Sequence, residues 1–439
     1  MLTLSVSAPW VDREERFHER CRGACCRSCG QRGLVPVLDM GDLPLADGWA
    51  LPVEPLDGLG RHPVALAACR GCKLLQLLDS VSPQLLYCRG YPYCPEVPGD
   101  WAERCRRDAA ALAEAHGLGA GSLAIQIASH DGRLLGHLQE RGVAVLGIEP
   151  AQQPTRAARN AGVPTLNAFF ERSLAAKLHA NGRQADLVVA SGVLPHVPDL
   201  DGFVSGVARL LKPRGAAVFE VPYVIDMIQG LQFDAVRHEH LSYFSAASLR
   251  SLLVRNGLHP VAAERRNTQG GSLRVTCRRE RPGRPPASLE RMLAEERARG
   301  LGRSELYASF ARRVKRLRVH LRQLLDCLRG RGKRIAALGA APEGTVLLDY
   351  LGLDRATVEY VIDRSPHKVG KLVPGTGIPI HPPSRLREDR PDYLLLLPQE
   401  LRRKELLIQQ RGYLAAGGKF ILPLPRPEVV EGGELPPCS

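Results

Sequence analysis

The sequence predicts a multidomain α/β protein, in which a small metal-binding domain precedes two Rossmann-like domains. Three observations predict it: two Cys-x-x-Cys pairs between residues 21 and 85, alternating strand and helix patterns over 105–280, and a shorter alternation over 331–425. The length of 439 residues agrees, because about two to four domains are expected at roughly 100–200 residues each.

Changes in composition set the expected boundaries. In chain order, we expect a flexible tail over 1–20, the metal-binding domain over 21–85, the larger α/β domain over 86–280, a linker and long helix over 281–330, the smaller α/β domain over 331–430, and a tail over 431–439. The linker begins in the arginine- and proline-rich segment 278–286. The long helix is predicted from apolar residues at steps of three and four: Leu306, Phe310, Val314, Leu317, Leu321, Leu324 and Leu328. Its basic outer face predicts a solvated bridging helix; a nucleic-acid-binding helix is the alternative.

Composition excludes several classes of protein. Hydrophobic residues make up 44% and charged residues 24% of the chain, which predicts a folded protein. We find no run of 18 or more apolar residues and no secretory signal pattern, so we expect a cytoplasmic protein with no membrane partner. The net charge is +14, but the arginines are scattered. This pattern favours a small anionic substrate over nucleic acid.

The cysteines cluster near the start of the chain, where eight of the twelve precede residue 95. Two knuckles of the Cys-x-x-Cys type supply the four thiolates of a tetrahedral zinc site. The predicted ligands are Cys26, Cys29, Cys69 and Cys72. Four protein ligands leave no open position, so we expect a structural zinc. Cys21 and Cys25 are alternatives to Cys26, and four buried or redox thiols are the alternative to a metal site.

The larger α/β domain begins with the pattern of a nucleoside-binding crevice. A strand over 123–128 leads into a turn at 129–132, then a helix, then a strand that ends at Glu149. An acid at this strand end binds ribose hydroxyls. The GxGxxG pattern of a dinucleotide site is absent, which makes S-adenosylmethionine the candidate ligand. Strands over 185–191 and 216–222 follow, with a turn at 212–215 that is usual in class I methyltransferases.

The order of these parts resembles the sugar C-methyltransferase family. That family combines a zinc-binding domain, a class I S-adenosylmethionine-dependent methyltransferase domain and a C-terminal Rossmann-like domain. The resemblance covers about residues 21–430. Its most specific segments are CRSCG with LDMGDLPLA, CRGCKLLQLLDSVSP, VLPHVPDL, FEVPY, HEHLSYFS, GGSLRV and VIDRSPHKVGKLVPGTGIPIHPP.

The resemblance implies a chemistry and its residues. The family's substrate is typically a nucleotide-linked 4-keto-deoxysugar, in which carbon three, beside the ketone, loses a proton to a base. The resulting enolate then attacks the sulfonium methyl group. By the match, His240 is the base, while Glu239 and His238 orient it or hold the sugar. Further pocket positions match at Tyr223, His196 and Ser272, and cofactor-binding positions match at Ala128, Ser129, Asp131, Gly132, Glu149 and Ser191. The alternative for the histidines is a surface-loop cap.

The chain departs from the family mainly at positions that face ligands. The family's E-I-G-S-N-D-G becomes Q-I-A-S-H-D-G over 126–132, and an asparagine pair becomes Ser191-Gly192. The departures elsewhere are Arg237 for an aromatic residue, Gln269 for histidine and Glu343 for lysine. We expect an active enzyme with an altered pocket, as a monomer or homodimer. The alternative is a catalytically impaired relative that acts as a binding or scaffold protein.

Overall fold

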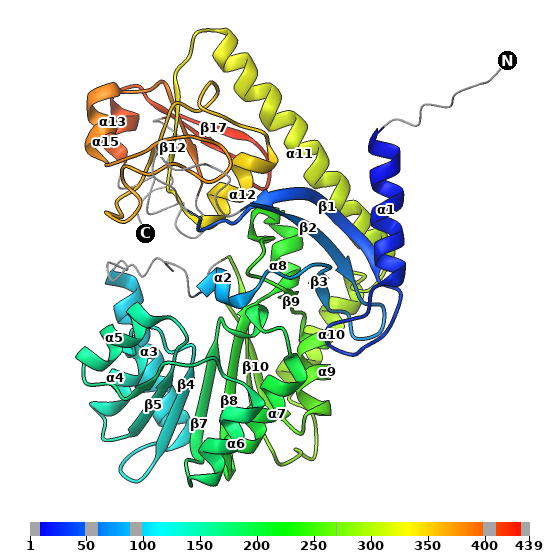
Figure 1. Ribbon diagram of the computed structural model, residues 1–439, viewed down its shortest axis with the longest axis vertical. Helices are drawn as coiled ribbons and strands as arrows, with labels where there is room; N and C mark the ends of the chain where they lie inside the picture. The colour runs from blue at the N-terminus through cyan, green and yellow to red at the C-terminus, as the bar shows by residue number, and fades with distance from the viewer. Residues whose placement is uncertain (1–8, 49–59, 88–98, 269, 398–409, 432–439) are drawn as a thin grey trace, which may run out of the picture.

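The described residues contain three β-sheets, which form three connected bodies (Figure 1). The computed structural model describes residues 9–48, 60–87, 99–268, 270–397 and 410–431. In strand order the sheets are β1-β2-β3-β9, β10-β11-β8-β7-β4-β5-β6 and β14-β13-β12-β15-β16-β17. The two larger sheets have parallel cores with helices between the strands. The predicted multidomain α/β fold class is confirmed.

The four-stranded sheet belongs mostly to the metal-binding domain. It contains β1 (Val35–Pro44), β2 (Arg61–Ala68) and β3 (Leu75–Leu77), all antiparallel. Its last strand, β9 (Ser242–Tyr243), comes from the larger α/β domain and pairs Tyr243 with Leu75. The histidine-containing segment that immediately precedes β9 is therefore anchored to the metal-binding domain.

A helix stands where the sequence predicted a flexible tail over 1–20, so that prediction is wrong for its second half. Helix α1 spans Pro9–Gly23. Phe17 is 7% exposed, and Arg13 makes a two-bond ion pair with Asp39 of β1. A few apolar residues in a mostly polar segment are a weak local signal, and the helix is stabilised by contacts with a sheet distant in sequence. Residues 1–8 lie outside the described part.

The seven-stranded sheet has the strand order of a class I methyltransferase. It contains β4 (Leu123–Ile127), β5 (Ala144–Ile148), β6 (Thr165–Leu166), β7 (Ala185–Ser191), β8 (Leu211–Pro222), β10 (His259–Arg266) and β11 (Ser272–Arg278). Strand β11 is antiparallel to both neighbours, and the first five strands are parallel. The predicted turn at 212–215 lies inside β8 as a bulge, because the pairing jumps from Leu211 with Ala185 to Ala216 with Leu187.

Helices cover both faces of this sheet (Figure 1). On one side lie α3 (Gly99–His116), α4 (Arg133–Gln139) and α5 (Gln152–Asn160); on the other lie α6 (Arg172–Ala180), α7 (Leu200–Leu210) and α9 (Ala246–Arg255). Shorter elements at the carboxyl end of the sheet are α2 (Pro83–Tyr87), η1 (Leu194–His196), α8 (Val224–Gln229) and η2 (Phe233–Ala235). They place several predicted site residues near one another.

Two helices connect the α/β domains. Helix α10 (Ala287–Ala298) packs on α9 and β10, and α11 (Ser304–Gly330) packs on β1. The buried face of α11 contains Tyr307, Phe310, Val314, Leu317, Leu321, Leu325 and Leu328. Leu306 and Leu324, which were expected on that face, are only partly buried. No described helix is long and apolar enough to cross a membrane.

The six-stranded sheet forms the C-terminal domain. It contains β12 (Ile335–Leu338), β13 (Val361–Ile362), β14 (Ile380–His381), β15 (Tyr393–Leu396), β16 (Lys419–Leu422) and β17 (Glu428–Val430), with helices α12 (Pro342–Tyr350), α13 (Ser384–Asp389) and α15 (Arg411–Ala415). Helix α12 contacts both β1 and η2. The three bodies therefore meet at the first turn of α12, beside the segment that leads to β9.

Candidate active site and metal site

The two cysteine knuckles come together at the start of the metal-binding domain. The Sγ atoms of Cys26, Cys29, Cys69 and Cys72 all lie within 4.8 Å of one another. Two of the Sγ–Sγ distances, Cys26–Cys72 and Cys29–Cys69, are 3.5 Å, close to the edge of about 3.8 Å in a tetrahedron with Zn–S bonds of about 2.3 Å. Cys21 and Cys25 lie outside this group. The donor set and its spacing fit a structural zinc ion.

The loop after β4 has a backbone conformation that favours glycine, although two of its residues carry side chains. Ala128 has φ +55° and His130 has φ +53°, both left-handed. For a residue with a side chain, that conformation costs about 1–2 kcal/mol. Gly132 is also left-handed, and a Cβ there would lie 3.0 Å from Val163 and 3.1 Å from Ala158. The loop therefore maintains a strained path that the surrounding packing imposes.

Polar groups suited to a nucleoside ligand surround this loop. Glu149 follows β5 and accepts hydrogen bonds from the backbone N–H groups of His130 (3.0 Å) and Ala151 (2.9 Å). These bonds orient a carboxylate that retains lone pairs for ribose hydroxyls. Gln126 Oε1 and Ser129 Oγ are buried without a hydrogen-bond partner among the described residues. Such atoms at the carboxyl ends of parallel strands fit the polar groups of S-adenosylmethionine.

Asp131 and Ser191 occupy the same edge of the sheet. Asp131 forms an ion pair of 3.0 Å with Arg133. Burial opposes ionisation of this carboxyl, but the hydrogen bond from His130 and the neighbouring charges lower its pKa to about 2. Ser191 ends β7, half-buried and paired with Glu220 of β8. The strand register thus brings the predicted cofactor residues to one edge.

Two predicted histidines contact each other beyond this edge. The rings of His196, in η1, and His240 lie 4.8 Å apart between centroids. His196 Nδ1 lies 2.7 Å from the carbonyl oxygen of Glu239 and 2.8 Å from the hydroxyl of Tyr87. Burial lowers the pKa of both imidazoles, and that of His240 falls well below 6.5. Tyr87 is a site residue that sequence reasoning missed, because a tyrosine 109 residues before His196 carries no local signal.

Other predicted pocket residues have partners elsewhere. His238 Nε2 donates to the carbonyl oxygen of His62, at 3.0 Å, in the metal-binding domain. The Tyr223 hydroxyl donates to Glu296 of α10, at 3.0 Å. Burial and the Glu296 charge raise the pKa of that tyrosine. These two side chains therefore position segments of the chain instead of joining the histidine pair.

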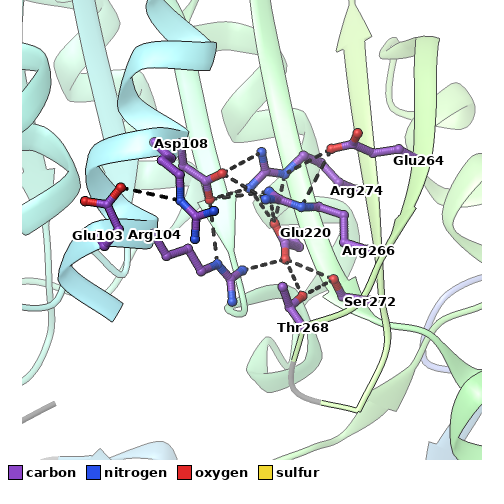
Figure 2. Close-up of polar contacts among 10 residues, drawn as sticks. Glu103, Arg104, Asp108, Glu220, Glu264, Arg266, Thr268, Ser272 and Arg274 are labelled. Atoms are coloured by element: carbon purple, nitrogen blue, oxygen red, sulfur yellow. Dashed lines mark hydrogen bonds and ion pairs between the residues drawn. The ribbon is translucent and has the colours of Figure 1, made fainter. Parts of the chain in front are cut away.

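A buried ionic group surrounds Ser272 (Figure 2). Its charged members, here called the Glu220 cluster, are Arg104, Asp108, Glu220, Arg266 and Arg274. Ser272 Oγ donates to Glu220 Oε1 at 2.9 Å, and Arg274 reaches both carboxylates at 2.7 and 2.8 Å. Through these ion pairs the cluster connects α3 with β8 and β11. It was not predicted from the sequence. Gln269, the other departure in this region, lies outside the described residues.

A second ionic group lies beside His240. Arg237 donates from Nε to Glu239 at 3.0 Å and from Nη1 to Glu343 of α12 at 2.8 Å. Its Nη2 lies 3.3 Å from His240 Nε2. Arg237 and Glu343 are both positions where the sequence departs from the family. Sequence reasoning noted the two departures separately and did not predict that they meet.

Comparisons with known proteins agree with this arrangement. Family models match in chain order: a zinc-binding domain over 26–87, a methyltransferase domain over 104–263 and a C-methyltransferase C-terminal domain over 267–425. C-methyltransferase NovU of Streptomyces niveus is 32% identical over 408 residues, which cover 92% of this chain and 96% of NovU. The chain belongs to this C-methyltransferase family. It is an S-adenosylmethionine-dependent C-methyltransferase with a zinc-binding domain, as the sequence predicted.

Other similarities are more limited. A ubiquinone biosynthesis O-methyltransferase of Bartonella bacilliformis is 30% identical over 97 residues, 22% of this chain and 39% of that protein. A solved structure, magnesium protoporphyrin IX methyltransferase from Synechocystis PCC 6803, covers 40% of this chain and 79% of its own, with 16% identity and a TM-score of 0.31.

Proposed function

We propose that this C-methyltransferase methylates the carbon beside the ketone of a nucleotide-linked keto-deoxysugar, or a related keto substrate, through an enolate. The observation that carries the proposal is the buried pair His196 and His240, beyond the strand ends that hold the cofactor-binding positions. The reaction needs a neutral base next to a methyl donor. Bound S-adenosylmethionine supplies an electrophilic methyl group.

His240 is suited to remove the proton. The guanidinium of Arg237 only donates hydrogen bonds, so its contact with His240 Nε2 assigns the lone pair to that nitrogen. Burial and the charge of Arg237 lower the pKa of His240, which keeps the imidazole neutral at physiological pH. His196, whose Nδ1 faces the Glu239 carbonyl, supports the ring of His240.

The charge and the cysteines of the chain favour a particular acceptor and cellular location. A net charge of +14 suits an acceptor that carries the phosphates of a nucleotide. We further propose a cytoplasmic enzyme, because its zinc-binding cysteines must stay reduced, and a monomeric or homodimeric state. Glu239 is proposed to orient the pocket through Arg237, and His238 through the metal-binding domain.

Calorimetry and isotope exchange test the proposal. We expect S-adenosylmethionine to bind the purified protein. The probe dTDP-4-keto-6-deoxyglucose should exchange the proton beside its ketone in heavy water and accept a methyl group. His240→Ala should slow exchange by about 10²–10⁴-fold and leave cofactor affinity unchanged. His320→Ala, which removes an exposed histidine on α11, is the matched control.

The outcomes separate the two functional hypotheses. No cofactor binding at millimolar concentration would overturn the enzyme proposal and favour the binding or scaffold protein. Cofactor binding with exchange that persists in His240→Ala would retain the methyltransferase but place the base elsewhere.

A further inference from the structure

Arg237 and Glu343 are 106 residues apart in the chain and form an ion pair of 2.8 Å between two domains. Arg237 lies between η2 and β9, and Glu343 lies in the first turn of α12. Their side chains are only 12% and 16% exposed. A buried arginine needs compensating charge, and here a second domain supplies part of it.

Further charged groups from all three domains surround this pair. We call the set the Arg237 cluster: Asp47, Arg237, Glu239, Glu343 and Lys368. Burial and the Glu239 charge raise the pKa of Asp47 to about 8. It is therefore protonated at neutral pH and donates to Glu239. Arg237 is the cation that pairs directly with both Glu239 and Glu343.

The guanidinium of Arg237 has hydrogen-bonding capacity left. Three of its five N–H groups face Glu239, Glu343 and His240, and the other two have no partner among the described residues. One of these two lies on each terminal nitrogen, and a guanidinium N–H group binds an anionic oxygen strongly. The contact with His240 Nε2 is long, at 3.3 Å, so a better acceptor would replace it.

We propose that Arg237 binds the ketone oxygen of the acceptor and stabilises the enolate, and that Glu343 is the positioning residue that holds Arg237 beside His240. This inference rests on the proposed function. The proton moves from carbon to His240 Nε2, the electron pair of the C–H bond forms the C=C bond of the enolate, and the π pair of the C=O bond moves to the ketone oxygen. That oxygen becomes negative next to the guanidinium, which no longer needs to donate to Nε2.

The same geometry links Arg237 to the pH dependence of the base. The titratable or charged groups packed against His240, among the described residues, are Arg237 from its own segment, His196 from η1 and Tyr243 from β9. Arg237 is the permanent cation among them. Its removal should therefore raise the pKa of His240 toward its ordinary value of 6.5.

The first test replaces Arg237 by glutamine. Methyl transfer to dTDP-4-keto-6-deoxyglucose should fall by about 10²–10³-fold, as for loss of an oxyanion donor, with S-adenosylmethionine affinity unchanged. Arg237→Lys should recover part of the rate. NMR titration of the His240 ring should show a higher pKa in Arg237→Gln. Transfer within threefold of the unchanged enzyme, or an unchanged His240 pKa, would overturn the inference.

The second test removes the carboxylate partner of Arg237. Glu343→Gln should lower methyl transfer at least tenfold with S-adenosylmethionine affinity unchanged, and Glu343→Asp should recover part of the rate. Added to Arg237→Gln, Glu343→Gln should cause little further loss, whereas an equal additional loss contradicts the positioning role. Arg61→Gln is the matched control, because it breaks another interdomain ion pair, to Asp349 at 2.7 Å.

Failure of the proposed function is distinguishable from failure of this inference. If the unchanged enzyme neither exchanges nor methylates the probe, the proposed substrate class is wrong. The NMR titration of His240 in Arg237→Gln then still tests whether Arg237 contacts His240. An unshifted pKa of His240 would overturn that contact.

Discussion

The protein contains two buried groups of arginines and carboxylates that differ in what they connect. The Glu220 cluster lies within one domain, where Arg266 and Arg274 reach both of its carboxylates. Hydroxyl groups occupy further acceptor positions on Glu220 (Figure 2). The Arg237 cluster joins three domains, contacts a histidine and retains unpaired N–H groups among the described residues. A satisfied network is suited to stability, whereas an incompletely paired one beside a buried histidine is suited to chemistry.

Removal of zinc should give the largest difference between the two clusters, because it should disorganise only the Arg237 cluster. Asp47 and the strand that pairs with β9 belong to the metal-binding domain, so loss of the metal should disorganise the Arg237 cluster. The Glu220 cluster has no member there. We expect chelation to lower methyl transfer at least 100-fold, because zinc-binding energy of about 10–16 kcal/mol stabilises such domains.

Calorimetry after chelation checks this prediction. S-adenosylmethionine should still bind within about tenfold of its original affinity, since its positions lie on the seven-stranded sheet. Re-addition of zinc should restore transfer. An equal loss of S-adenosylmethionine binding and of methyl transfer would mean that the seven-stranded sheet depends on the metal-binding domain.

Arg274→Ala should weaken the fold and leave the chemistry unaltered. Arg274 is 12% exposed and bonds both Asp108 and Glu220; without it these carboxylates keep Arg104 and Arg266 as cationic partners. We expect the free energy of unfolding to fall by about 3–5 kcal/mol, as for the loss of two hydrogen bonds between charged groups. Chemical denaturation measures this loss.

The pH profile of Arg274→Ala provides the contrast with Arg237→Gln. It should match that of the unchanged enzyme, measured below the unfolding temperature of the variant. A shifted acid limb in Arg274→Ala would assign that arginine to the pocket and remove the distinction between the clusters.

The pH dependence of kcat/KM should show the low basicity of the histidine pair. A base must be neutral to accept a proton, and burial lowers the pKa of both His196 and His240 below 6.5. Activity should therefore persist as the pH falls through 6.5 and decline only at more acidic values. Arg237→Gln should move the decline to higher pH. A decline centred above 6.5 in the unchanged enzyme would contradict a neutral, buried base.

Ala128→Gly should have the smallest effect, with the opposite sign. Alanine at φ +55° is strained, and glycine removes this strain but gains entropy when the chain unfolds. We expect a stabilisation of about 0.5–1 kcal/mol, measured by denaturation. Ala124→Gly is the control: it lies in β4, outside the left-handed positions, and should destabilise the protein. Destabilisation by Ala128→Gly would show that the loop is not strained.

The sequence by itself determined the features that depend on local pattern. The cysteine knuckles, the strand over 185–191, the acid at the end of β5 and the multidomain α/β fold are all present. Each is encoded in residues that are close in sequence, because periodicity and turn chemistry act over a few residues.

Only the tertiary structure decided which side chains meet. It turned Tyr223 toward Glu296 and His238 toward His62, and it placed Tyr87 on His196. These contacts join residues 73 to 176 positions apart in the chain. They follow from the packing of the three sheets, which no local sequence pattern predicts. The same packing brought two separate departures from the family, Arg237 and Glu343, together in one ion pair beside His240, because burial requires each charge to have a partner.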